Sequence, residues 1–326
     1  MLQGFSQYNG KHGCSFCYDP GVCLVQGDGY TRAYPYHCSS VLRNRDDVVD
    51  LNEQAVAAGH QILGVKGPSI LQLLPDFDII QGLVPDYMHS VLLGVARQLA
   101  KLWFDSTNHD KPYYISAADQ KAIDSVLTAI RPPCNISRLP RSISVRKFWK
   151  AHEWYAWLCY YSLPVLQLHL PKKFLMHLSL LVDGITLLLS DSISATQLDH
   201  CDKVLTQFVI DFETLYGLNN LSFNVHLCLH LTSSVRAWGP LWAHSAFVYE
   251  AFNAKLLDMI KGTQAVPLQI CKTFALQRSL AMFMARVTAS ESCSSEYKAI
   301  FQSLLPAATR LQQCDYVNGV TLLGRC

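Results

Sequence analysis

The chain has 326 residues, of which half are hydrophobic, 16% are charged and 11% are aromatic. Such a composition supports a large core and excludes an intrinsically disordered protein. Twenty-seven Lys and Arg residues against 25 Asp and Glu residues leave a formal net charge of +2. The protein is therefore not coated with basic charge, although this balance allows a local basic patch.

The most apolar run of the sequence covers 177–189. It is shorter than the ~20 residues of a membrane-spanning helix and has Asp183 in its middle, so it predicts a buried helix. The first residues lack the apolar segment of a secretory signal, and the twelve cysteines form no compact framework. We therefore expect a soluble protein of the nucleus or cytoplasm, neither secreted nor in a membrane, with mostly free thiols.

The predicted elements begin with loops and short strands, because the N-terminal part has little helical periodicity. A helix is predicted over 46–60, with Asp46 or Asp47 as its N-cap and Gly59 at its end. Another helix begins at Asp86, where apolar residues recur at helical spacing. That stripe consists of Met88, Val91, Leu92, Val95, Leu99 and Leu102.

Helical patterns continue through most of the remaining chain. Ser116 caps one helix, and an aromatic helix is predicted over 147–166. The clearest helix covers 195–216, because Ser194 and Gln197 have the spacing of a capping box. Further helices are predicted at 224–237, 245–261 and 268–286. The sequence therefore predicts a mainly α protein.

Two pairs of residues could together hold a metal ion. Cys14 and Cys17 form a C-x-x-C pair, whose turn can aim both sulfurs at one Zn²⁺, although two ordinary reduced thiols can have the same spacing. His226 and His230 share one face of a predicted helix, as metal ligands or as two hydrogen-bonded core histidines. Because Cys₂His₂ is a common ligand set of structural zinc, the two pairs in one chain favour a shared zinc site.

Acidic residues outside these pairs have two interpretations each. Glu250 lies on a predicted helix face with small and apolar neighbours. It is interpreted either as a ligand of a divalent cation or as a surface residue. Asp86 and His89 stand at the head of a predicted helix, as metal ligands or as an N-cap with a nearby histidine.

The segment 131–150 contains six Arg and Lys residues and no acidic residue. It could track DNA phosphates, or it could be a solvated connector. Trp149, Trp154 and Trp157 are expected in the core rather than as platforms for base stacking. The candidate DNA contacts are Arg138, Arg141, Arg146, Lys147 and Lys150.

Five motifs follow one another along the chain: GCSFC, DYMHSVLLGV, WKAHEWYAWLCYYSLPVL, NVHLCLHL and GPLWAHSAFVYEAFN. In this order they resemble the CACTA (En/Spm-like) DNA transposases, which belong with the Mirage and Chapaev groups. More distantly they resemble the Transib transposases and the catalytic subunit of the V(D)J recombinase. The resemblance covers roughly residues 1–270 and implies the C-terminal part of such a catalytic region.

The resemblance implies an RNase H-like fold interrupted by a large helical insertion. In that family two Asp and one Glu bind two Mg²⁺ ions for in-line attack on DNA phosphates. By analogy with the recombinase, the Cys pair and the His pair share one structural zinc that clamps the insertion onto the catalytic core. The family's C-x-x-C corresponds to Cys14 and Cys17, and its Met-His pair corresponds to Met88 and His89. Its spaced histidines correspond to His226 and His230, and its catalytic Glu corresponds to Glu250.

The family places both catalytic Asp residues upstream of its C-x-x-C, whereas residues 1–13 contain no Asp or Glu. We therefore expect a truncated or domesticated fragment that lacks the early strands of the sheet and cannot transfer DNA strands alone. Its expected parts are a zinc-ligand loop region with a remnant of the catalytic core (1–80), the helical insertion (81–220), the His-pair helix with the core helices that carry Glu (221–287), and a tail (288–326).

Two other functions remain open. The chain could be a non-enzymatic helical protein that binds partner proteins through the apolar region 145–190. It could also be a metal-dependent nuclease with replacement acids, for which Asp19 and Asp86 are the candidates near Cys17 and His89. The transposase interpretation predicts DNA as the partner and allows self-association.

Overall fold

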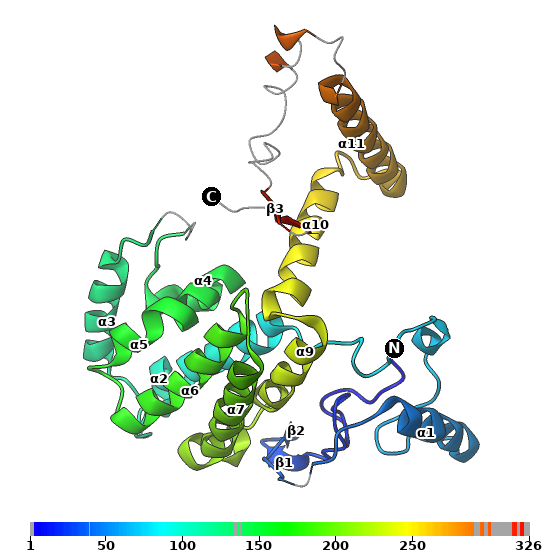
Figure 1. The fold of residues 1–326 in the computed structure, drawn as a ribbon. Helices are drawn as coiled ribbons and strands as arrows, with labels where there is room; N and C mark the ends of the chain where they lie inside the picture. Colours follow the sequence, from blue (N-terminus) through cyan, green and yellow to red (C-terminus); the bar gives the residue numbers. More distant parts are fainter. Residues whose placement is uncertain are drawn as a thin grey trace. The chain divides into compact units, whose positions relative to one another are not determined.

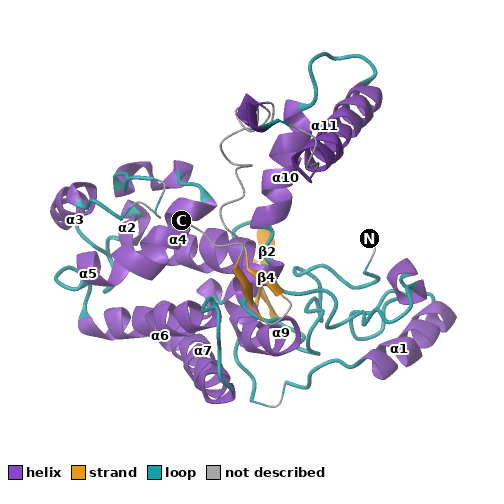
Figure 2. Ribbon diagram, turned by 45° about the horizontal axis from the view of Figure 1, so that its top comes forward, coloured by secondary structure: helices purple, strands orange, loops and turns teal. Residues whose placement is uncertain are grey.

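The computed structural model describes residues 3–38, 40–133, 136, 138–289, 294–296, 299–300, 315–317 and 320–322. Contacts divide the chain into two compact units, Met1–Ala246 and Phe247–Cys326. The described residues are mainly helical, as predicted, and the strands among them occur in two short pairs (Figures 1 and 2). The predicted division into four parts stays a prediction.

The N-terminal region of the first unit combines loops with one hairpin and one helix. Strand β1 (Val22–Gln26) pairs antiparallel with β2 (Gly29–Ala33), which confirms the expected short strands. Helix α1 (Arg45–Ala58) ends at Gly59, whose φ of 69° suits a glycine cap. The predicted N-cap was wrong, because the side chain of Asn44 accepts the Asp47 backbone N–H at 2.8 Å. A small core beneath α1 consists of Phe5, Val48, Leu51, Val65, Ile79 and Ile80.

Helices form the rest of the first unit. The α-helices are α2 (Arg97–Phe104), α3 (Ala117–Ala129), α4 (Ala151–Ala156), α5 (Ser162–Leu166), α6 (Lys172–Leu188), α7 (Ala195–Tyr216), α8 (Phe223–Leu227) and α9 (Leu231–Trp238). Two π-helical segments cover Met88–Ala96 and Trp157–Tyr161. Short 3₁₀ helices cover Ile70–Leu73, Ser106–Asn108, Ile143–Phe148, Leu218–Asn220, Cys228–His230 and Leu241–His244.

An aromatic core lies where α2, α6 and α7 meet. The apolar stripe that begins at Met88 is buried throughout, and the buried helix predicted over 177–189 belongs to α6. The capping box of Ser194 and Gln197 begins α7, as predicted. The largest buried rings of this core are Trp103, Phe174, Phe208 and Phe212. Trp149, Trp154 and Trp157 are also buried, as expected.

Three helices that the sequence predicts as continuous contain other turns, and the one predicted over 224–237 is divided into α8 and α9 by the 3₁₀ turn Cys228–His230. The aromatic helix begins at Ala151 rather than at 147, because the Glu153 side chain accepts the Lys150 backbone N–H at 2.8 Å and caps that start. The helix after Asp86 opens with a π-helical segment that packs closely on α8. A Cβ on Gly94 would stand 2.7 Å from Nδ2 of Asn224, so a larger residue would require the Asn224 side chain to move.

The described part of the second unit includes two long helices and a strand pair. Helix α10 covers Phe247–Asp258 and α11 covers Val266–Ala289, which confirms the predicted helices at 245–261 and 268–286. Strands β3 (Asp315–Val317) and β4 (Val320–Leu322) pair antiparallel. Among the described helices of both units, none combines the length and apolarity needed to cross a bilayer.

Candidate metal centre

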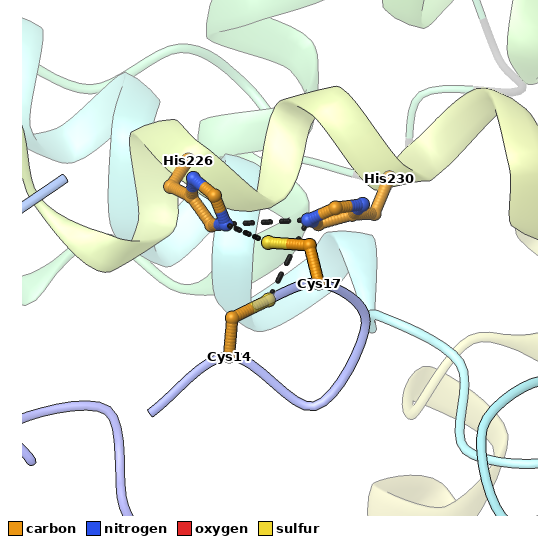
Figure 3. Close-up of side chains that lie close together, drawn as sticks. All are labelled: Cys14, Cys17, His226 and His230. Atoms are coloured by element: carbon orange, nitrogen blue, oxygen red, sulfur yellow. Dashed lines mark hydrogen bonds between the residues drawn. The ribbon is translucent and has the colours of Figure 1, made fainter. Parts of the chain in front are cut away.

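Four side chains from two distant parts of the first unit converge on one point (Figure 3). Cys14 and Cys17 lie on the loop before β1, whereas His226 lies in α8 and His230 ends the 3₁₀ turn between α8 and α9. Sγ of Cys14 is 3.5 Å from Nε2 of His230, and Sγ of Cys17 is 3.3 Å from Nε2 of His226. The two Nε2 atoms are 3.2 Å apart. All four potential ligand atoms lie within 4.8 Å of one another.

These distances fit a tetrahedral zinc site. Zinc binds sulfur at about 2.3 Å and imidazole nitrogen at about 2.0–2.1 Å, which places S and N roughly 3.6 Å apart and two N atoms roughly 3.3 Å apart. The observed separations are 3.5, 3.3 and 3.2 Å. The predicted residues therefore form a cluster that could bind zinc through Cys₂His₂ ligands.

The cluster is buried and surrounded by rings. Its four residues are at most 4% exposed. The Phe16 ring lies 5.2 Å from the His230 ring, and the Tyr34 ring lies 5.0 Å from the His226 ring. The Phe16 backbone N–H also donates to Sγ of Cys14 at 3.4 Å. Four protein donors in an enclosed apolar setting are typical of a structural site rather than of a catalytic one, which keeps a position for water.

The pKa values of the two cysteine thiols are shifted in opposite directions. Burial, together with the nearby Cys17 sulfur, raises the pKa of Cys14 well above its ordinary value. The hydrogen bond from Cys14, followed by hydrogen bonds from His226 and His230, lowers the pKa of Cys17. Burial lowers the pKa of His230, which keeps this imidazole neutral. A thiolate and a neutral imidazole are the forms that bind metal.

Arg43 is a buried neighbour of the cluster that the sequence analysis missed. It is 4% exposed, and its Nε donates to the backbone oxygens of Cys14 and Cys17 at 3.0 Å each. Arg43 lies in SSVLRNRDD, two residues before Arg45, and no spacing pattern in the sequence links it to the C-x-x-C. Its contact with the cluster depends on the folded path of the loop.

Asp86 and His89 lie together but outside the cluster. The Asp86 carboxylate accepts the backbone N–H groups of His89 at 3.1 Å and Ala246 at 2.8 Å, and it contacts Nδ1 of His89 at 2.6 Å. These contacts are those of a helix-capping acid. Within the described residues, the four-residue Cys/His set is the group found with metal-ligand geometry, so a metal role for Asp86 and His89 stays a prediction.

Glu250 lies in the first turn of α10 and is exposed. Helix α10 belongs to the second unit, whereas the Cys/His cluster belongs to the first. Its catalytic role stays a prediction.

The five basic candidates differ in their surroundings. Arg141 binds Glu153 through two nitrogens at 2.5 and 2.8 Å, and Arg138 lies 3.9 Å from the same carboxylate. Arg146 is partly buried, with Cζ 5.6 Å from the centre of a phenylalanine ring. Lys147 and Lys150 are exposed. Arg138 and Arg141 are exposed too, and contact of the five with DNA stays a prediction.

Comparison of the chain with protein-family models, with curated proteins and with solved structures finds no match.

Proposed function

We propose that this chain is a zinc-stabilised fragment of a CACTA-like DNA transposase that acts on DNA in the nucleus. The observation that carries the proposal is the convergence of Cys14, Cys17, His226 and His230 at the spacing of tetrahedral zinc ligands. The zinc would be structural. It would supply bonds between a loop and a helix that lie 209 to 216 residues apart in the sequence.

The ligand set explains why a metal would be used at this place. The loop that carries Cys14 and Cys17 contains no helix or extended strand of its own, and it is held mainly by contacts with other loops. Zinc binding to such a segment contributes directly to folding free energy, because the unfolded chain has no preformed site. The proposed role of the centre is to fix the N-terminal loops against the helices that begin with α8.

The proposed DNA contact centres on Lys147 and Lys150. Both are exposed, and Nζ of Lys147 lies 4.9 Å from the ring of Phe148, which is 61% exposed. Lysine side chains neutralise phosphates and release counterions, which gives sequence-independent affinity. Arg138 and Arg141 share Glu153, so their charge is partly offset and their contribution should be smaller.

Catalysis is proposed only for the intact enzyme. In this proposal Glu250 is the third metal-binding carboxylate, and Mg²⁺ also needs two Asp residues of the family's catalytic core. The nuclease alternative is less favoured, because its replacement acids have backbone partners. Asp19 is buried and accepts the Gly21 N–H at 2.8 Å, and Asp86 accepts two backbone N–H groups.

A protein-interaction module is the second candidate function. It is favoured by the exposed apolar side chains of the second unit, which lie on both α10 and α11. Large exposed apolar surfaces on a folded protein indicate a partner or self-association. The most exposed of these side chains are Val248, Tyr249, Leu257 and Leu276.

Metal analysis and DNA binding together test the proposal. Protein purified without chelator should contain about one zinc per chain. Replacing Lys147 and Lys150 with Glu should weaken binding to duplex DNA and lower the slope of log affinity against log salt by about 2. The matched control is Lys203→Glu on α7, an exposed lysine outside the basic segment. Protein without zinc would contradict the proposal, and zinc-loaded protein that binds no DNA but captures a discrete partner would favour the interaction module.

A further inference from the structure

Arg43 is held at a fixed place beside the Cys14–Cys17 turn. Its backbone N–H donates to the Phe16 oxygen at 2.9 Å, and the residue before it, Leu42, forms a β-bridge with Cys17. The Arg43 segment therefore runs antiparallel to the turn at this bridge. Any movement of this segment would move the backbone that carries the two sulfurs.

The guanidinium of Arg43 donates to carbonyl groups of two loops. Nε donates to the oxygens of Cys14 and Cys17 at 3.0 Å each, so both proposed zinc ligands point their carbonyls at one nitrogen. Nη2 donates to the oxygens of Leu63 at 2.7 Å and His12 at 3.3 Å. Four carbonyls from two loop segments, 12–17 and the one that contains Leu63, thus share one planar group.

Aromatic rings hold the guanidinium in its plane. Its Cζ lies 4.4 Å from the centre of the Tyr18 ring and 5.2 Å from that of the Phe5 ring. In the part of the chain that the structure describes, no carboxylate forms an ion pair with Arg43. The buried charge is therefore stabilised mainly by carbonyl oxygens and ring faces, which is an arrangement suited to positioning.

We infer that Arg43 is the positioning residue of the metal centre, an inference that rests on the proposed zinc. Turning the carbonyls of Cys14 and Cys17 toward one nitrogen fixes the peptide planes of the turn. The turn then aims both sulfurs at the histidines before any metal arrives. A lysine keeps the charge but not the planar fork, and it cannot reach the carbonyls of both segments together.

The test compares zinc affinity in Arg43→Lys and Arg43→Gln with the wild type. Competition with a metal-chelating dye measures the zinc dissociation constant. We expect both variants to bind zinc on the order of 10–100-fold more weakly, which is the usual effect of losing a group that orients metal ligands. Cobalt-substituted protein supplies a second readout, because its visible absorption bands report the angles around the metal. These bands should shift in both variants.

Arg32 provides the matched control. It also donates to backbone oxygens of the N-terminal loops, those of Asn9 at 3.2 Å, Pro20 at 2.8 Å and Gly21 at 3.1 Å, but to neither proposed zinc ligand. Arg32→Lys and Arg32→Gln should therefore lower thermal stability without changing zinc affinity or the cobalt bands. A loss of zinc affinity equal in both pairs of variants would show that Arg43 acts only through general stability.

The outcomes separate this inference from the proposed function. Wild-type protein without zinc overturns both. Wild-type protein with one zinc, and an Arg43→Lys variant of equal affinity and unchanged cobalt bands, overturns the positioning role alone. If the Arg43 variants fold poorly, a measurement on the wild-type protein still tests the inference. In ¹⁵N-arginine-labelled protein, zinc removal should shift the Nε–H resonance of Arg43, and an unchanged resonance would count against the inference.

Discussion

The metal-centre region and the aromatic core of the first unit are stabilised by different kinds of contact. In the aromatic core, the His177 ring of α6 stacks on the Phe208 ring of α7 with centroids 4.3 Å apart, and within α7 the Phe212 and Tyr216 rings meet at a tilt with centroids 4.7 Å apart. Around the metal centre, loops meet helices through a few directional polar contacts. Apolar packing is spread over many atoms, whereas the cluster depends on four donors. Losing one contact should therefore matter more at the metal centre.

The largest expected effect comes from breaking the metal centre. In the zinc-loaded protein, His230→Ala or a strong chelator should remove the ion and destabilise the first unit by roughly 5 kcal/mol or more, since structural zinc contributes folding free energy. Hydrogen exchange should accelerate first at residues 12–18 and in α8, while α6 and α7 stay protected. Uniform acceleration throughout the first unit would show that the two regions are not separate in stability.

The complementary change removes a ring from the aromatic core. Phe208 is fully buried, so Phe208→Ala should lower the free energy of unfolding by about 3–5 kcal/mol, through lost apolar contact and the cavity left behind. Chemical denaturation measures this loss, and metal analysis should find the zinc content of the folded protein unchanged. A loss of zinc in folded Phe208→Ala protein would mean that the core, rather than the ligands, determines metal binding.

A smaller effect depends on pH. Burial lowers the pKa of His177 to about 4, and its Nε2 donates to the Phe208 oxygen at 2.9 Å. The unfolded state, with an ordinary pKa near 6.5, therefore binds a proton more readily than the folded state. Stability from this residue is present above about pH 6.5 and is lost as pH falls toward 4, by up to about 3 kcal/mol.

The variant His177→Gln keeps a donor for the Phe208 oxygen but cannot gain a charge. Between pH 7 and pH 4.5 it should lose less stability than the wild type, as measured by denaturant unfolding at each pH. His109→Gln is the control, because His109 is exposed. Equal pH dependence in wild type and His177→Gln would show that another group governs acid sensitivity.

The two regions also differ in how far sequence predicts them. Periodicity predicted most helices of the aromatic core, because burial of one helix face requires apolar residues at every third or fourth position. The Cys and His pairs were also recognisable, because ligand spacing is local within each pair. That the two pairs share one site could be predicted only from the family resemblance or seen in the fold. The role of Arg43, the π-helical turns and the Asn44 cap depend on loop paths and close packing, such as that of Gly94 on Asn224, for which the sequence has no periodic signature.

The spacing of the cluster along the chain has a consequence during synthesis. A ribosome adds roughly 5–20 residues per second, so about 10–40 s separate the translation of Cys17 from that of His226, 209 residues later. Throughout that interval the nascent chain displays two thiols whose imidazole partners do not yet exist. Oxidant applied during translation should therefore reduce the yield of native protein more than the same dose applied after release from the ribosome.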